Sequence, residues 1–151
     1  MSRGGWRPPP WYDQPGRRIG FVHQLRQLDG VGIGRDPKRR SGFAVSFTVT
    51  PNGVPTRSVT VQFLPQTPSV PRMYVDGPSD SPHRYDDGTL CMWHPKDASP
   101  MRWAPEAGPA DLVTRIVVHL IKEAWFRRCG EWVGEEVTHH QRDEANDPEL
   151  S

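Results

Sequence analysis

Cysteine is scarce in this 151-residue chain, which contains only Cys91 and Cys129. Two cysteines are too few for the disulfide framework with which small secreted domains compensate for a limited core. No apolar run approaches the length of a membrane span or follows the pattern of a secretory signal. We therefore expect a cytoplasmic protein with reduced cysteines, in which a cysteine placed in a loop needs a chemical explanation.

The chain also lacks an excess of charge, because its 19 Lys and Arg residues are matched by 18 Asp and Glu residues. Without a net field to attract nucleic acid or an anionic membrane, we expect neither as a partner. Proline and glycine are abundant instead, with 17 and 14 residues, which indicates a compact centre with many turns. The length predicts one domain that buries roughly two thirds of the surface of the unfolded chain.

Composition divides the chain into three segments. Residues 1–18 combine prolines, glycines and arginines with aromatic residues, which predicts a flexible arm. The alternative for this segment is a tail whose aromatic side chains dock on the domain or on a partner. Residues 19–140 form the predicted domain, and residues 141–151 predict a disordered acidic tail.

Apolar periodicity in the first half of the chain predicts a short helix followed by an antiparallel meander. Apolar residues at helical spacing predict an amphipathic helix over 19–28, and the glycine-rich stretch after it predicts a loop. Alternating runs at 43–49 and 58–64 predict a hairpin. A third run at 71–78 begins at a proline, which favours an edge strand.

A broad apolar stripe predicts a long helix in the second half of the chain, so that the fold class is α+β. The stripe runs from Leu112 to Trp125. Asp111 lies near the positive end of this helix, and Gly130 is placed to end it. Cys129 follows Trp125 by four residues, which predicts a small apolar side chain in the core.

The stretch HRYDDGTLCMWHP, residues 83–95, surrounds Cys91 with groups that titrate or donate protons. Asp87 and Gly88 form a turn dipeptide just before it, so we expect a constrained and partly exposed loop around the thiol. A nucleophile for acyl transfer needs this access, a stabilised thiolate and a hydrogen-bond donor for the oxyanion. His83, eight residues before Cys91, is a candidate donor.

Several short motifs, taken in order over roughly residues 19–130, resemble those of ubiquitin-conjugating enzymes. In that family a His-Pro-Asn triplet, with its Asn eight residues before the catalytic cysteine, is followed by Gly-x-Ile/Leu-Cys, by Trp-x-Pro and by a helix. The counterparts here are Ser81-Pro82-His83, Gly88-Thr89-Leu90-Cys91 and Trp103-Ala104-Pro105. Pro-His, Tyr85 and the later Gly130-Glu131-Trp132-Val133-Gly134 are most similar to the bacterial branch, which is associated with ubiquitin-like conjugation operons, many of them anti-phage systems.

The resemblance implies that Cys91 accepts a ubiquitin-like protein from an activating enzyme as a thioester and passes it to a nucleophile on a target protein. It implies no metal or organic cofactor, because the activating enzyme spends the ATP. His83 replaces the family's Asn, and its imidazole adds a possible acid or base role to that of oxyanion donor. The family's acidic residue has no fixed counterpart here, and the candidates by proximity in sequence are Asp86, Asp87 and Glu106.

Other residues near the motifs are candidates for supporting roles. We expect the ring of Tyr85 to pack beneath the loop with its hydroxyl bonded to a partner. His94 is a candidate either for packing against the loop or for tuning the Cys91 thiolate. His139 and its neighbour His140 belong either to an exposed tail or to a segment that reaches back to the site.

Three other functions remain open at this stage. The first is a catalytically inactive scaffold that binds the activating enzyme or the ubiquitin-like protein. The second is a cysteine hydrolase in which His83 or His94 activates Cys91. The third is a zinc site that combines Cys91 and His94 with Cys129, His139 or His140, although a Cys-x-x-His pair is only half a site.

Overall fold

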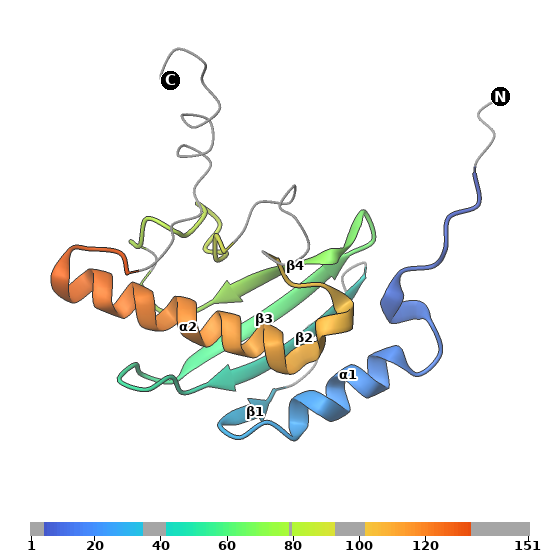
Figure 1. Cartoon of the computed structure of the whole chain (residues 1–151), viewed down its shortest axis with the longest axis horizontal. Coiled ribbons are helices and arrows are strands. Elements are labelled where there is room, and N and C mark those ends of the chain that lie inside the picture. The colour runs from blue at the N-terminus through green and yellow to red at the C-terminus, as the bar shows by residue number, and fades with distance from the viewer. Residues whose placement is uncertain (1–4, 35–41, 79, 93–101, 134–151) are drawn as a thin grey trace, which may run out of the picture.

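The computed structural model describes residues 5–34, 42–78, 80–92 and 102–133. Within these ranges the chain forms an N-terminal helix, an antiparallel sheet of four strands and a long C-terminal helix (Figure 1). The predicted α+β fold class is therefore confirmed. No helix among the described residues is long and apolar enough to cross a lipid bilayer. The predicted tail at 141–151 lies outside these ranges.

The sheet is a meander in which each strand pairs with the next one along the chain. Its order is β1-β2-β3-β4, and every neighbouring pair is antiparallel. The strands are β1 (Val31–Ile33), β2 (Phe43–Val49), β3 (Arg57–Leu64) and β4 (Thr67–Val75). The predicted hairpin of β2 and β3 is confirmed, because the two strands pair antiparallel from Phe43 with Phe63 to Val49 with Arg57.

Two parts of the strand prediction were wrong. The glycine-rich stretch predicted as a loop contains β1, which pairs with β2 although glycine is unfavourable in strands. The third run begins at Thr67 rather than Pro71, so β4 is longer than predicted. It is an edge strand, as expected, and an edge accommodates Pro68 and Pro71 because one side of the strand needs no partner.

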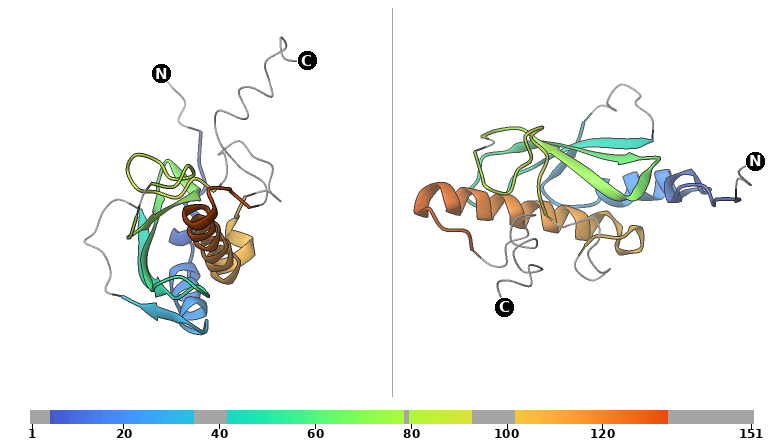
Figure 2. Two further views of the ribbon diagram at one scale, coloured as in Figure 1. Left: turned by 90° about the vertical axis from the view of Figure 1, so that its left-hand side faces the viewer. Right: turned by 90° about the horizontal axis from the view of Figure 1, so that it is seen from above.

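Two helices cover one face of the sheet. The helix α2 (Gly108–Cys129) crosses this face, and α1 (Arg17–Arg26) lies beside it near β1 (Figures 1 and 2). Short 3₁₀ helices precede them, η1 (Trp11–Asp13) before α1 and η3 (Pro105–Ala107) before α2. Trp103 is buried and donates from Nε1 to the Gly108 carbonyl at 2.7 Å, so it anchors the start of the long helix.

The core lies between the sheet and α2, and alternation places its residues there. The side chains of β2 alternate strictly between buried and half-buried positions. The core contains Phe43, Val45, Phe47, Val49, Val59, Val61, Phe63, Met73 and Val75 from the sheet and Leu112, Ile116 and Leu120 from α2. Burial of these side chains is the main favourable contribution to folding.

Trp11 and Tyr12 belong to this core, which overturns the flexible arm at these two residues and agrees with the alternative in which the aromatic side chains dock on the domain. Both are buried, and the ring of Trp11 lies 5.1 Å from that of Phe63 and 6.2 Å from that of Trp103, measured between centroids. The indole Nε1 of Trp11 also donates to the Pro68 carbonyl at 2.6 Å. The aromatic side chains outweigh the prolines and glycines around them because two large rings bury much apolar surface.

Cys129 was predicted to be in the core, and this prediction was wrong because the side chain is exposed. The apolar stripe of α2 is broader than the face that touches the sheet, so Val118, Ile121 and Trp125 are exposed as well. Cys129 is the last residue of α2, whose final turn extends past the strands (Figures 1 and 2). Helical spacing from Trp125 therefore continues an outer face rather than the core face.

Candidate active site

The segment that carries Cys91 folds back against the edge of the sheet. After β4 ends at Val75, the chain turns and returns, so that Thr89 forms a β-bridge with Tyr74. The Leu90 amide donates to the Met73 carbonyl at 3.0 Å. This pairing covers part of the β4 edge and fixes the residues just before Cys91 to the sheet.

A tight turn precedes the cysteine, as the Asp87-Gly88 dipeptide predicted. Asp87 accepts hydrogen bonds at Oδ1 from the Thr89 amide at 2.9 Å and from the Thr89 hydroxyl at 2.6 Å. These two bonds hold the pKa of Asp87 below its usual value. Asp87, one of the acidic candidates, thus stabilises the turn, and Gly88 adopts a φ of +87°, which favours glycine.

Cys91 is half-buried at the end of this turn. Its amide donates to the carbonyl of His83 at 2.8 Å. The thiol takes part in a side-chain hydrogen bond with Tyr85, and burial together with this bond raises the pKa of the Tyr85 hydroxyl. Tyr85 is 37% exposed, and its hydroxyl has a hydrogen-bond partner, as expected. Its hydroxyl stays protonated at neutral pH and serves as a donor at the candidate nucleophile.

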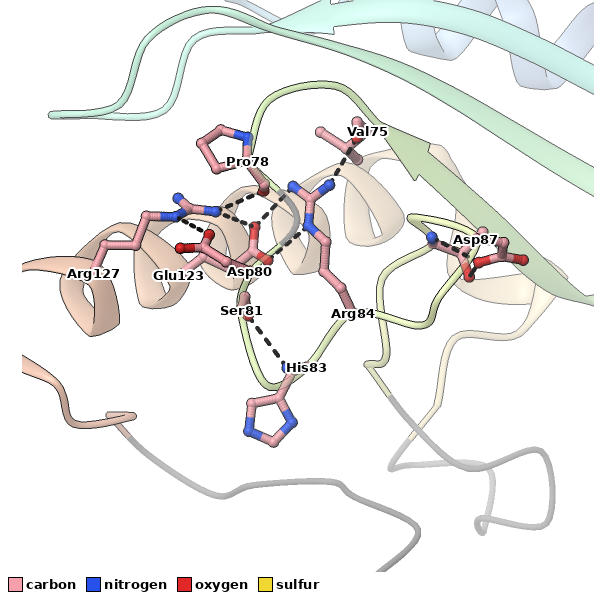
Figure 3. Close-up of polar contacts among 10 residues, drawn as sticks. Val75, Pro78, Asp80, Ser81, His83, Arg84, Asp87, Glu123 and Arg127 are labelled. Carbon is pink, nitrogen blue, oxygen red and sulfur yellow. Dashed lines mark hydrogen bonds and ion pairs between the residues drawn. The ribbon is translucent and has the colours of Figure 1, made fainter.

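The imidazole of His83 faces the interior rather than solvent. The side chain is 1% exposed, and its ring centroid lies 4.1 Å from that of Trp132. The His83 amide donates to the Ser81 hydroxyl at 3.3 Å (Figure 3). The main chain of His83 therefore contacts Cys91 directly, and the role of its imidazole as an oxyanion donor stays a prediction.

His119 of α2 completes a buried aromatic cluster with His83 and Trp132. Its ring centroid lies 5.2 Å from that of Trp132 and 6.5 Å from that of His83. Burial lowers the pKa of His119 to about 4, and its Nε2 has no hydrogen-bond partner within the described part of the chain. His119 is consequently neutral at physiological pH, a property that its place in a helical pattern did not reveal.

A buried ion pair joins the cysteine segment to α2. The Arg84 guanidinium donates to both carboxylate oxygens of Glu123, at 2.8 and 3.0 Å, and to the Val75 carbonyl at 2.8 Å (Figure 3). Both charged side chains are only 1% exposed. A planar guanidinium bound at three oxygens has a fixed position and orientation.

A second arginine fastens the beginning of the same segment to α2. Arg127 donates to the Pro78 carbonyl at 2.8 Å and to the Asp80 carboxylate at 3.2 Å, and it lies 3.8 Å from Glu123 (Figure 3). Its hydrogen bond to Asp80 lowers the pKa of that carboxyl group. Glu123 thus lies between two guanidinium groups.

The sequence analysis missed Arg84, Glu123 and Arg127. The available signal was Glu123, which lies three residues after the core residue Leu120 and seven after Ile116, and so falls on the buried face of the helix. A carboxylate at such a position requires a buried cation as its partner. Nothing in the sequence singled out Arg84 as that cation.

A cleft of about 470 Å³ lies next to the cysteine. Leu90 and Met92, the neighbours of Cys91 in sequence, both line it, together with Tyr85, Asp86, Asp87, Thr89 and residues 70–72 of β4. Arg72 contributes the positive charge of the cleft and the two aspartates contribute its negative charges. Among the acidic candidates, Asp86 and Asp87 therefore line this cleft, whereas Glu106 belongs to η3.

The metal alternative receives no support from the described residues, where no cluster of His, Cys, Asp and Glu that could hold a metal ion is found. His94, His139 and His140 lie outside the described ranges. Their predicted supporting roles and their contribution to a zinc site stay predictions.

Comparison with family models and curated proteins does not identify a family for this chain. No family model matches the chain, and no curated protein matches its sequence.

Proposed function

We propose that this chain is a ubiquitin-conjugating-like transferase, with Cys91 as the residue that carries a ubiquitin-like protein as a thioester. The proposal includes an activating enzyme as the source of the acyl group and a protein nucleophile as its acceptor. It places the chain in a bacterial ubiquitin-like conjugation pathway that serves antiviral defence. The motifs around Cys91 motivate this assignment, and no cofactor is needed for the transfer.

The observation that carries the proposal is the setting of the Cys91 thiol. Cys91 is half-buried, its amide donates a hydrogen bond to the His83 carbonyl, and its thiol is hydrogen-bonded to the Tyr85 hydroxyl. A nucleophilic thiol needs both access and neighbours that stabilise the thiolate. The partial exposure provides the access, and the Tyr85 hydroxyl is a suitable neighbour.

The chemistry consists of two acyl transfers. In the first, the Cys91 thiolate attacks the thioester carbonyl on the activating enzyme, so that a new C–S bond forms and the departing thiolate of that enzyme takes up a proton. In the second, an amine of the target attacks the Cys91 thioester, an amide bond forms as the C–S bond breaks, and the proton that the amine gives up reaches the departing Cys91 thiolate by way of a carboxylate of the site. A donor at the oxyanion is worth about 3 kcal/mol in such reactions.

The cleft beside Cys91 supports the second step. Its aspartates give a cationic amine a favourable approach, and Asp86 is exposed. Asp87 is bound to Thr89, so Asp86 is the better candidate for receiving the proton of the amine. Replacement of Asp86 by Asn should therefore slow transfer from Cys91 without slowing its charging.

A charging assay tests the proposal. Wild type, Cys91→Ser, Cys91→Ala and Cys129→Ser are incubated with ATP, a bacterial activating enzyme and its ubiquitin-like protein, and the products are separated on non-reducing gels. We expect a thiol-sensitive adduct with wild type and Cys129→Ser and none with Cys91→Ala. Cys91→Ser should form an adduct that resists thiol, because an oxygen ester is not cleaved by thiol exchange.

The negative outcomes are informative as well. Absence of any adduct, with partners that are competent towards another acceptor, would contradict the transferase and favour the inactive scaffold. Loss of the adduct in Cys129→Ser would contradict the choice of cysteine. Turnover of a simple thioester or ester without the activating enzyme would favour the hydrolase instead.

A further inference from the structure

We propose that the buried Arg84–Glu123 pair is a positioning element that sets where Cys91 lies relative to α2. This inference deepens the proposed function, on which its catalytic part rests. Among the described residues, it is the only ion pair in which each of the two side chains is just 1% exposed.

The Arg84–Glu123 pair is connected to Cys91 through the backbone. Arg84 follows His83, whose carbonyl accepts the hydrogen bond from the Cys91 amide at 2.8 Å. Arg84 itself forms a β-bridge with Leu90, the residue before the cysteine. A displacement of the Arg84 backbone is therefore passed to Cys91 through two adjacent backbone contacts.

The hydrogen bonds of the Arg84 side chain also fix how the cysteine segment is oriented. The Arg84 guanidinium is bound at three points, the two oxygens of Glu123 on α2 and the Val75 carbonyl at the end of β4. Figure 3 shows Arg84 reaching from the cysteine segment towards Glu123 and Val75. Three directional bonds fix the segment against the helix and the sheet together, whereas apolar contacts would permit it to slide.

The free-energy cost of burying two charges also favours a positioning role. Taking two charges out of water costs several kcal/mol per ion, and a well-packed apolar pair of similar volume often gives equal or better stability. Stability alone therefore gives little reason for Arg84 and Glu123 at these positions. Orientation of the Cys91 segment is a reason that fits their geometry.

The test replaces both charges at once in the full-length chain, with Arg84→Met and Glu123→Leu. Because Arg84 and Glu123 are removed together, and Arg127 loses its neighbour Glu123 but keeps its bonds to Asp80 and Pro78, we expect a melting temperature within about 5 °C of wild type. We expect the Cys91 amide to exchange its hydrogen at least about tenfold faster, while amides in the centre of β3 keep their rates. In the charging assay the rate should fall about tenfold, as expected for a misplaced nucleophile.

The matched control removes the exposed pair of the same helix, with Asp111→Asn and Arg115→Gln. Arg115 Nε lies 2.7 Å from Asp111 Oδ2, and both side chains are substantially exposed. We expect this variant to keep the wild-type exchange rate at Cys91 and the wild-type charging rate. A structural role shared by all ion pairs of α2 would change both variants alike.

Two results would overturn the positioning role. One is a wild-type exchange rate at the Cys91 amide in the double variant, and the other is faster exchange with an unchanged charging rate. Should the double variant fail to fold, Glu123→Gln takes its place, because the amide side chain keeps an oxygen for the guanidinium. The same criteria then apply, with an expected increase of about threefold in the exchange rate of the Cys91 amide. Hydrogen exchange can be measured without a partner protein. A wild-type protein that forms no thioester in the charging assay would therefore contradict the proposed function. The exchange rate of the Cys91 amide would still decide whether the pair positions Cys91.

Discussion

The Cys91 segment and the end of α2 each present a cysteine, and they differ in how that cysteine is held. Neither cysteine forms a disulfide, and Cys129 is the more exposed of the two. Cys129 ends a helix that Gly130 terminates through a hydrogen bond to the Phe126 carbonyl at 2.7 Å. Cys91 instead follows a turn held by hydrogen bonds to the sheet, to its own segment and, through Arg84, to α2.

The difference indicates that exposure alone does not identify a reactive cysteine. Accessibility lets any reagent reach Cys129, whereas a defined nucleophile needs a fixed position and groups that stabilise its thiolate. Cys91 has the Tyr85 hydroxyl at its sulfur and the Arg84–Glu123 pair behind its backbone. The following predictions separate these two kinds of cysteine.

The largest expected effect concerns pH, because the Cys91 segment rests on a buried histidine. The pKa of His119 is lowered to about 4 by burial, with Glu123 opposing the shift and His83 and Arg84 adding to it. The unfolded chain therefore binds more protons between about pH 6.5 and pH 4, and the free energy of unfolding should fall by about 3 kcal/mol over this range.

The measurement is urea denaturation at a series of pH values, with His119→Met as the comparison. The Met side chain does not titrate, so the variant should lose about 3 kcal/mol less than wild type between pH 6.5 and pH 4. The protection factor against hydrogen exchange, which corrects for the intrinsic pH dependence of exchange, should fall at pH 5 more at the Cys91 amide than at the Phe126 amide in α2. Parallel stability profiles for the two proteins would contradict the buried, neutral state of His119.

A smaller effect is expected from the two glycines beside the cysteines. Gly88 and Gly130 have φ values of +87° and +74°, and a Cβ added at either would meet nothing within 4 Å. Alanine should therefore cost about 1 kcal/mol of backbone strain at each position, measured by urea denaturation. Only Gly88→Ala should also change the alkylation rate of Cys91, and an equal change in Gly130→Ala would show that the turn has no special link to the thiol.

The smallest expected effect is on thiol reactivity in Tyr85→Phe. The hydroxyl is bonded to the Cys91 thiol, and loss of one donor should reduce the alkylation rate of Cys91 at pH 7.5 about threefold. Mass spectrometry of the two cysteine peptides measures both rates in one sample, with Cys129 as the internal control. A decrease at both cysteines, or at neither, would remove Tyr85 from the account of Cys91.

Much of the fold was predictable because it depends on local periodicity. The alternation in β2 and β3 and the stripe of α2 are strong signals that the structure follows. The prediction failed where distant contacts decide the outcome. The glycines in and after β1 favoured a loop, whereas pairing with β2 makes this stretch a strand. Cys129 lies at helical spacing from Trp125, but on a face of α2 that does not contact the sheet.

The candidate site was predictable in part for the same reason. The Asp87-Gly88 turn and the partly exposed position of Cys91 followed from neighbouring residues. The Arg84–Glu123 pair joins residues 39 positions apart, and many arginines could have matched the buried carboxylate. Long-range pairs of this kind depend on how the segment returns to α2, which spacing in the sequence does not specify.

The most direct test of the central claim is to locate the acyl bond in the charged wild-type protein. The thiol-sensitive adduct is purified, digested at low pH under non-reducing conditions and mapped by mass spectrometry. The account predicts that the C-terminus of the ubiquitin-like protein is joined to the peptide that contains Cys91, with Cys129 available for alkylation in the same molecules. A thioester at Cys129, or an amide bond to a lysine in place of any thioester, would contradict it.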